Sequence, residues 1–222
     1  MFKLPMIRFK KLRLWLMYPI FVVYPFAAHI TGFSYCCGAI LMLVGLGIRF
    51  WDSGYIIKSQ VLATSGPYAY TRNPLYVGNF LLGLGISVTS GNIWIIIYYA
   101  VTFTLLYLGT IRDEQEFLEK KFGDAFRDYV SNVPVFLPSW KAYQRAEKKG
   151  FDIDQSFKNG EFIRLCGFLI LLIFIYLCWS FVVLRETLKR GNTLALFLFV
   201  VFLLLLWFNI YIRRKSERRS RT

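Results

Sequence analysis

The chain has 222 residues, of which 56% are hydrophobic and 19% aromatic, and it carries a formal net charge of +14. This composition, with a mean hydropathy of +0.47, excludes an ordinary soluble domain. The basic residues lie beside apolar runs, which favours a membrane protein over a nucleic-acid-binding protein. Four cysteines without zinc-site spacing and a single histidine, His29, indicate that no metal site is present.

Apolar runs predict six membrane-spanning helices, at about 12–30, 33–51, 75–90, 92–111, 162–184 and 193–212. The predicted fold class is therefore all-α, a polytopic membrane helical bundle. If the N-terminus is cytoplasmic, every lysine and arginine lies on the cytoplasmic side except Arg185, Lys189 and Arg190. We therefore expect both termini, and both long polar segments at 52–74 and 112–161, on that side.

Three parts are predicted along the chain. Residues 1–140 form a core of four spans followed by an amphipathic helix at 112–131. Residues 141–161 are charged and form a cytoplasmic linker. Residues 162–222 form a transmembrane hairpin with a basic tail.

Residues 64–78 form a polar island rich in turn residues between two apolar runs. Asparagine is a favourable N-cap and proline is favoured at the first helical position, so the third span is predicted to begin at Asn73-Pro74. A helix N-terminus attracts anions, and the tyrosine rings of this stretch attract cations such as a sulfonium group. The alternative interpretation is an interfacial aromatic belt with Arg72 extended toward the headgroups.

A second polar element, from Arg112 to Leu118, continues the fourth span into the cytoplasm. Glu114 lies at the water boundary, where a carboxylate can accept hydrogen bonds from hydroxyl groups. The alternative is a solvated carboxylate on a helix surface. The helix beyond carries an apolar stripe and is expected either to lie along the membrane or to fold over the 64–78 loop. The prolines of Val133-Pro134 and Pro138 then end the helix and return the chain toward the membrane.

Together these elements resemble the isoprenylcysteine carboxyl methyltransferases and their phospholipid methyltransferase relatives. The similarity extends over roughly residues 33–138 and rests on five motifs in the family's order: Ser65-Gly66-Pro67-Tyr68, Arg72-Asn73-Pro74-Leu75-Tyr76, Glu114-Gln115-Glu116-Phe117-Leu118, Phe122-Gly123-Asp124-Ala125-Phe126 and Val133-Pro134.

The resemblance implies an integral membrane enzyme that transfers a methyl group from S-adenosylmethionine to a lipophilic acceptor arriving from the bilayer. It implies a cofactor pocket on the cytoplasmic side, in a membrane of the bacterial inner-membrane type. The implied cofactor contacts are Gln60, Val61, Leu62, Ala63, Tyr68, Asn73, Pro74, Leu75, Tyr76 and Glu114. Arg72 and Arg112 are candidates for placing an anionic group of the substrate.

Three positions depart from the isoprenylcysteine enzymes. Gln115 stands where they have a second acid after Glu114, so only the first carboxylate of the pair remains. Asn73 stands where they have histidine, and Thr110 stands where they have the arginine thought to read the substrate carboxylate. The acceptor therefore stays open among carboxyl, thiol and amine lipids. Two other functions remain as alternatives: an NADPH-dependent membrane reductase of the sterol-reductase type, and a membrane scaffold or transporter subunit without catalytic activity.

Overall fold

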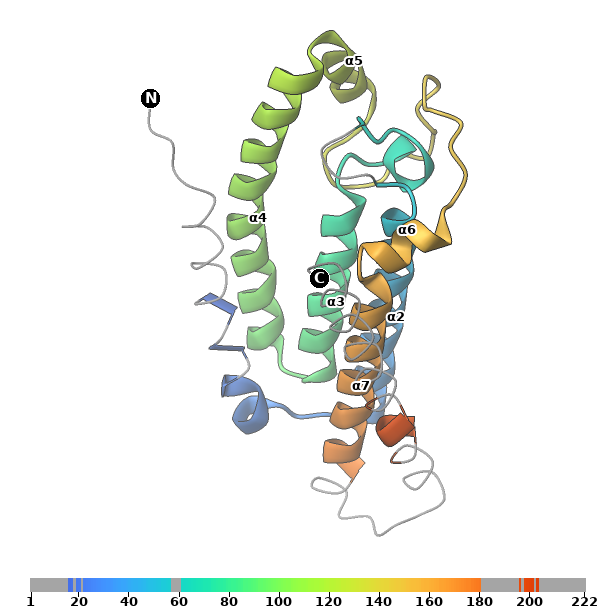
Figure 1. Ribbon diagram of the computed structural model, residues 1–222. Coiled ribbons are helices and arrows are strands. Elements are labelled where there is room, and N and C mark those ends of the chain that lie inside the picture. Colours follow the sequence, from blue (N-terminus) through green and yellow to red (C-terminus); the bar gives the residue numbers. More distant parts are fainter. Residues whose placement is uncertain are drawn as a thin grey trace, which may run out of the picture. The chain divides into compact units, whose positions relative to one another are not determined.

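The computed structural model describes residues 16–56, 61–180 and 196–203, except positions 18, 21, 197 and 202 (Figure 1). The chain divides into two compact units, Met1–Ser156 and Phe157–Thr222. Within the described residues all regular structure is helical, which confirms the predicted all-α class. The predicted three-part division of the chain stays a prediction.

Three of the described helices are long and apolar enough to cross a membrane: α2 (Gly32–Ser53), α4 (Ile93–Phe122) and α7 (Glu161–Cys178). The helix α3 (Pro74–Thr89) is apolar but has only 16 residues. The predicted first span lies partly outside the described residues, and the predicted sixth span lies mostly outside them. The chain is thus an integral membrane protein, while the count of six spans stays a prediction.

In the first unit, the backbones of α2 and α3 come close together because glycines face each other along both helices. A Cβ atom on Gly38 would lie 2.6 Å from the carbonyl oxygen of Gly85, and one on Gly45 would lie 2.8 Å from that of Gly78. Both distances are shorter than van der Waals contact, so a larger residue would push the helices apart. The buried Arg49 of α2 donates a hydrogen bond to the side-chain oxygen of Asn79 on α3.

The helices α3 and α4 instead pack through aromatic rings. Phe80 of α3 contacts Tyr99 and Phe103 of α4, with ring centroids 6.1 and 5.2 Å apart. Phe103 stacks on Tyr107 with centroids 3.9 Å apart. Phe136, which lies further along the chain, packs edge-on against Phe80 with ring centroids 5.8 Å apart. Tyr99, Phe103 and Tyr107 belong to a buried hydrophobic cluster of the unit, and Phe80 and Phe136 pack against it.

The helix α4 is longer than a membrane crossing requires. Its 30 residues extend about 45 Å, whereas a bilayer's hydrocarbon core is about 30 Å thick. Residues 93–111 carry no charge, so the charged remainder from Arg112 onward projects past the apolar part. In Figure 1 this end of α4 extends well beyond the start of α3.

The predicted continuous helix at 112–131 is divided in the structure. Gly123 has φ +52°, a left-handed conformation that ends α4 and begins a separate helix, α5 (Asp124–Asn132). Glycine adopts this conformation without the steric penalty of a Cβ atom. The break turns α5 so that Phe126 and Tyr129 form a buried cluster, with Leu118 and Phe122 packed against it. Phe117 of the predicted stripe stays half exposed.

Two further helices are α6 (Ile153–Lys158), in which the boundary between the units falls, and α7 of the second unit. Ser156 of α6 shares a hydrogen bond of 2.5 Å with Ser53 at the end of α2, and both hydroxyl groups are buried. In the second unit, α7 begins at Glu161, whose carboxylate pairs with Arg164 one turn later.

Candidate functional site

The candidate site lies at one end of the first unit, where α2 ends, α3 begins and α4 passes by; we call this the site end. A short 3-10 helix, η1 (Gly66–Ala69), lies between α2 and α3 in the chain. Figure 1 shows η1, α5 and the connecting loops gathered at this end. The polar stretches at 61–76 and 112–149 thus meet in one region of the fold.

A hydrogen bond joins the two segments that the sequence assigns to cofactor binding. The hydroxyl group of Tyr76, in the first turn of α3, donates to Oε2 of Glu114 on α4 over 3.0 Å. The Tyr76 ring also packs edge-on against Tyr107, with centroids 5.0 Å apart. Glu114 is exposed, and its position three residues past the uncharged part of α4 leaves it accessible to a ligand from water.

A second carboxylate, Asp52, lies in the last turn of α2 with 1% of its surface exposed. The buried Tyr68 of η1 donates a hydrogen bond from its hydroxyl group to Asp52. Burial raises the pKa of Tyr68 well above its usual value, and the charge of Asp52 adds to that rise. Tyr68 is therefore neutral at physiological pH and fixes η1 against the end of α2.

Residues 133–149, here called the return segment, run back along residues 69–73. Backbone hydrogen bonds join Arg72 N–H to Pro134 O at 2.9 Å and Ser139 N–H to Tyr70 O at 2.8 Å. The side chain of Asn73 donates from Nδ2 to Val135 O at 2.8 Å. The predicted turn at Val133-Pro134 thus brings the chain back, as expected, onto the start of α3.

Asn73 takes the N-cap position of α3 with Pro74 at the first helical position, as predicted. Its side chain, however, makes no capping hydrogen bond, because the amide turns to Val135 instead. The helix start is therefore fixed by proline and by the return segment, with Pro74 fully buried. The amide holds two loops together and leaves the first turn of α3 without a side-chain cap.

The helix α5 covers η1, which agrees with one of the two placements expected from its apolar stripe. The buried Tyr129 donates from its hydroxyl group to Tyr68 O at 2.7 Å, and burial raises its pKa despite the opposing charge of Arg72. On the outer face, Asp128 accepts hydrogen bonds from Tyr143 at 2.5 Å and from Arg145 at 2.9 Å. The bond from Tyr143, aided by Arg145, lowers the pKa of Asp128.

Two buried N–H groups at the site end have no hydrogen-bond partner among the described residues: Nε of Arg72 and Nε2 of Gln115. Burial lowers the pKa of Arg72. Buried N–H donors without acceptors are uncommon in folded proteins and suggest an acceptor supplied from outside the chain. Together with the Glu114 carboxylate and the Tyr76 ring, they suit a ligand with hydroxyl, acceptor and cationic groups, as S-adenosylmethionine has.

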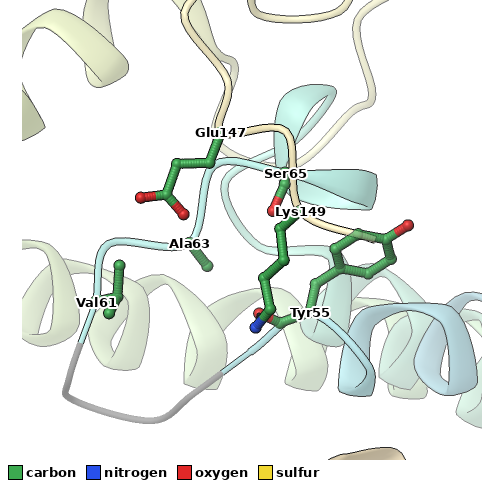
Figure 2. Close-up of a pocket in the computed structure, with 6 residues that line it drawn as sticks. All are labelled: Tyr55, Val61, Ala63, Ser65, Glu147 and Lys149. Atoms are coloured by element: carbon green, nitrogen blue, oxygen red, sulfur yellow. Dashed lines mark hydrogen bonds between the residues drawn. The ribbon is translucent and has the colours of Figure 1, made fainter. Parts of the chain in front are cut away.

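The predicted contacts at 60–63 fall into different surroundings. Gln60 lies outside the described residues. Leu62 packs against the Phe126–Tyr129 cluster, whereas Val61 and Ala63 line a small pocket with Tyr55, Ser65, Glu147 and Lys149 (Figure 2). Leu75 is partly buried in the first turn of α3.

The two candidate substrate-binding arginines differ. Arg72 is partly buried within the site end, while Arg112 is exposed and makes no hydrogen bond or ion pair with any described residue. Thr110 donates to Leu106 O within α4, over 3.1 Å. Sequence reasoning missed Asp52, for which a lone carboxylate at the end of an apolar helix was the available signal. It placed Tyr129 in the apolar stripe but not its hydrogen bond to Tyr68.

Comparison with known proteins gives several matches. Residues 28–125 match the family model described as phospholipid methyltransferase. The cobalt-zinc-cadmium resistance protein CzcN of Cupriavidus metallidurans is 37% identical over 109 residues, covering 48% of this chain and 49% of that protein. The nickel-cobalt-cadmium resistance protein NccN of Alcaligenes xylosoxydans xylosoxydans is 36% identical over 124 residues, covering 50% and 58%. The protein-S-isoprenylcysteine O-methyltransferase of Schizosaccharomyces pombe is 33% identical over 81 residues, covering 36% and 34%. No solved structure shows significant similarity to the chain.

The helices and the site end define an all-α integral membrane protein with a polar site at one end of its apolar helices. Residues 28–125 match the phospholipid methyltransferase family model, and part of the chain is similar to an isoprenylcysteine O-methyltransferase, which confirms the resemblance seen in the motifs. The chain spans about half the length of the two resistance proteins that it matches. The return segment lies outside the matched range.

Proposed function

We propose that this protein transfers a methyl group from S-adenosylmethionine to a lipophilic acceptor that reaches the site from the bilayer. The hydrogen bond between Tyr76 and Glu114 carries the proposal. Tyr76 and Glu114 are 38 positions apart in sequence. The bond therefore joins the 60–76 segment to the Glu114 element, and the family motifs assign both to cofactor binding. The match of residues 28–125 to a methyltransferase family model supports the same conclusion.

In this proposal Glu114 accepts hydrogen bonds from hydroxyl groups of the cofactor, and Tyr76 orients that carboxylate. The buried N–H groups of Arg72 and Gln115 donate to acceptors of the ligands. The other proposed cofactor contacts are Gln60, Val61, Leu62, Ala63, Tyr68, Asn73, Pro74 and Leu75. The bound cofactor supplies a methyl group on a sulfonium sulfur, which leaves as a neutral thioether.

Methyl transfer breaks the carbon–sulfur bond while the acceptor's lone pair forms the new bond in line with it. Because the leaving group is neutral and good, alignment of the two reactants and exclusion of water supply most of the catalysis. A carboxylate acceptor needs no general base, whereas a thiol or an amine must also lose a proton. The site end requires no titrating group at Asn73, where an amide holds the return segment.

The acceptor is proposed to be an isoprenylcysteine carboxylate or another carboxyl, thiol or amine lipid. The name of the yeast relative supports the first of these, while the names of the two resistance proteins indicate no acceptor. Arg72 is the better placed of the two arginines to hold an anionic group, because it lies within the site end. We further propose that the site end faces the cytoplasm of a bacterial-type inner membrane, with both chain termini on that side.

The test compares Glu114→Gln with Glu116→Gln, an exposed glutamate on the same helix. Calorimetry in detergent should show that the wild type binds S-adenosylmethionine and not NADPH. Glu114→Gln should weaken binding about 10- to 100-fold, the effect of losing hydrogen bonds to a charged group, while Glu116→Gln binds like the wild type. Incubation with methyl-labelled cofactor, lipid extract and prenyl-cysteine analogues should give a labelled lipid product.

Three results would contradict the proposal. Binding of NADPH in place of S-adenosylmethionine would identify a reductase. Binding of neither compound, with no labelled product, would indicate a protein without this activity. Unchanged affinity in Glu114→Gln would remove Glu114 from the cofactor site.

A further inference from the structure

A small pocket beside the predicted cofactor segment is lined by two side chains of opposite charge. It has a volume of about 110 Å³ and is lined by Tyr55, Val61, Ala63, Ser65, Glu147 and Lys149. In Figure 2 Glu147 extends toward Val61 and Ala63, and Lys149 extends toward Tyr55. The two charged residues belong to the return segment and the others to the opposite wall.

The return segment is anchored over this pocket. Glu147 N–H donates to Oγ1 of the buried Thr64 at 3.1 Å, and Lys149 Nζ donates to Tyr55 O at 3.3 Å. The Glu147 carboxylate makes no hydrogen bond or ion pair with any described residue. The Lys149 ammonium keeps two further N–H donors, because an ammonium has three. The pocket therefore offers one free anionic acceptor and one cationic donor from a backbone held in place.

The size of the pocket restricts what it can hold. Sites that enclose drug-sized ligands have volumes of about 300–1,000 Å³, so this pocket cannot enclose a whole nucleoside cofactor. It can hold a short zwitterionic group with one ammonium and one carboxylate. S-adenosylmethionine ends in such a group, an α-amino acid on a short aliphatic chain.

We propose that this pocket binds the α-amino acid end of the methyl donor, with Glu147 receiving its ammonium group and Lys149 its carboxylate. The inference rests on the proposed function and extends the cofactor site to residues outside the family-matched range. Val61 and Ala63 connect the pocket to the remaining cofactor contacts, because both line it and both belong to the segment that the motifs assign to the cofactor. The return segment then has two functions: it fixes the start of α3 and it completes the donor site.

The experiment measures the affinities of three compounds in detergent by calorimetry. S-adenosylmethionine has both charged groups, decarboxylated S-adenosylmethionine has only the ammonium, and 5′-methylthioadenosine has neither. Lys149→Met should bind S-adenosylmethionine about tenfold more weakly, as expected for one charge-assisted hydrogen bond at a partly exposed position. It should bind the other two compounds like the wild type.

Glu147→Gln should weaken binding of both compounds that carry the ammonium and leave 5′-methylthioadenosine unaffected. Lys148→Met removes the same charge from a neighbouring exposed side chain that does not line the pocket, and it should match the wild type for all three. Retained binding of 5′-methylthioadenosine shows that each variant is folded.

The inference is overturned if the wild type binds S-adenosylmethionine while Lys149→Met and Glu147→Gln bind it equally well. It is also overturned if Lys148→Met reproduces the loss seen in Lys149→Met, since a general charge effect would then explain both. A wild type that binds none of the three compounds overturns the proposed function itself, which is a distinguishable result.

Discussion

The close approach of α2 and α3 can be tested with one methyl group. A Cβ atom on Gly38 would lie 2.4 Å from Cγ2 of Thr89, 2.6 Å from Gly85 O and 2.8 Å from Thr89 N. Two of these atoms belong to the backbone of α3 and its last turn, so the clash cannot be relieved by a side-chain rotation. The helices must separate by several tenths of an ångström, and such overpacking costs about 1–3 kcal/mol.

Gly47, on the same helix, provides a matched control. An added Cβ atom there meets nothing within 4 Å. Gly47→Ala should therefore stabilise the protein by about 0.5–1 kcal/mol, because alanine loses less conformational freedom than glycine in a helix. The same chemical change is thus expected to act in opposite directions at two positions nine residues apart.

The assay is the apparent melting temperature of the purified protein in detergent. At roughly 2–4 °C per kcal/mol for a chain of this size, Gly38→Ala should melt several degrees below the wild type and Gly47→Ala slightly above it. Because α3 carries Tyr76 toward Glu114, Gly38→Ala should also bind S-adenosylmethionine more weakly. A Gly38→Ala protein that melts at or above the wild-type temperature would refute the glycine packing of α2 on α3.

Two further predictions concern the return segment. Asn73→Asp should replace the N–H donor of the hydrogen bond to Val135 O with a second acceptor and destabilise the loop by about 1–3 kcal/mol. Asn73→His is the control, because histidine keeps an N–H donor. Proteolysis of residues 133–140 should be faster in the aspartate variant alone, and equal rates in the two variants would contradict the prediction. The bond from Tyr143 to Asp128 lowers the pKa of Asp128 from its usual 3.8 and raises that of Tyr143 from its usual 10.0. Its stabilisation is therefore fully present between these two values and lost as the pH falls through the lowered pKa of Asp128 or rises through the raised pKa of Tyr143. In the wild type, hydrogen-exchange protection of residues 141–149 should decline at both low and high pH, and in Tyr143→Phe this pH dependence should be lost. Protection that stays constant across the pH range in the wild type would argue against the hydrogen bond.

Much of the helical layout could be predicted from local patterns. Apolar runs marked α2, α3, α4 and α7, and Asn73-Pro74 marked the start of α3 to the residue. The motif set also indicated the resemblance that the family model finds over residues 28–125. These features follow from hydropathy, helix propensity and the fixed φ angle of proline, which act within a few residues of the chain.

Local patterns failed where the partner lay far away in sequence. Asn73 looked like an ordinary N-cap, but the structure turns its amide to Val135, 62 positions later. A stripe of apolar residues suggested one helix at 112–131, but Gly123 divides it and α5 folds over η1. In both cases a tertiary contact replaced the local interaction that the residue type favours.

The sequence by itself determined the apolar helices, the polar stretch at 64–78 and the acidic element at Glu114, because each of these features depends only on residues that are neighbours in the sequence. Only the tertiary structure decided that Tyr76 meets Glu114, that Tyr68 bonds to the buried Asp52, and that Glu147 and Lys149 lie against Val61 and Ala63. The physical reason is packing. Facing glycines bring α2 onto α3, aromatic rings set the distance from α3 to α4, and hydrogen bonds tie the return segment to the start of α3.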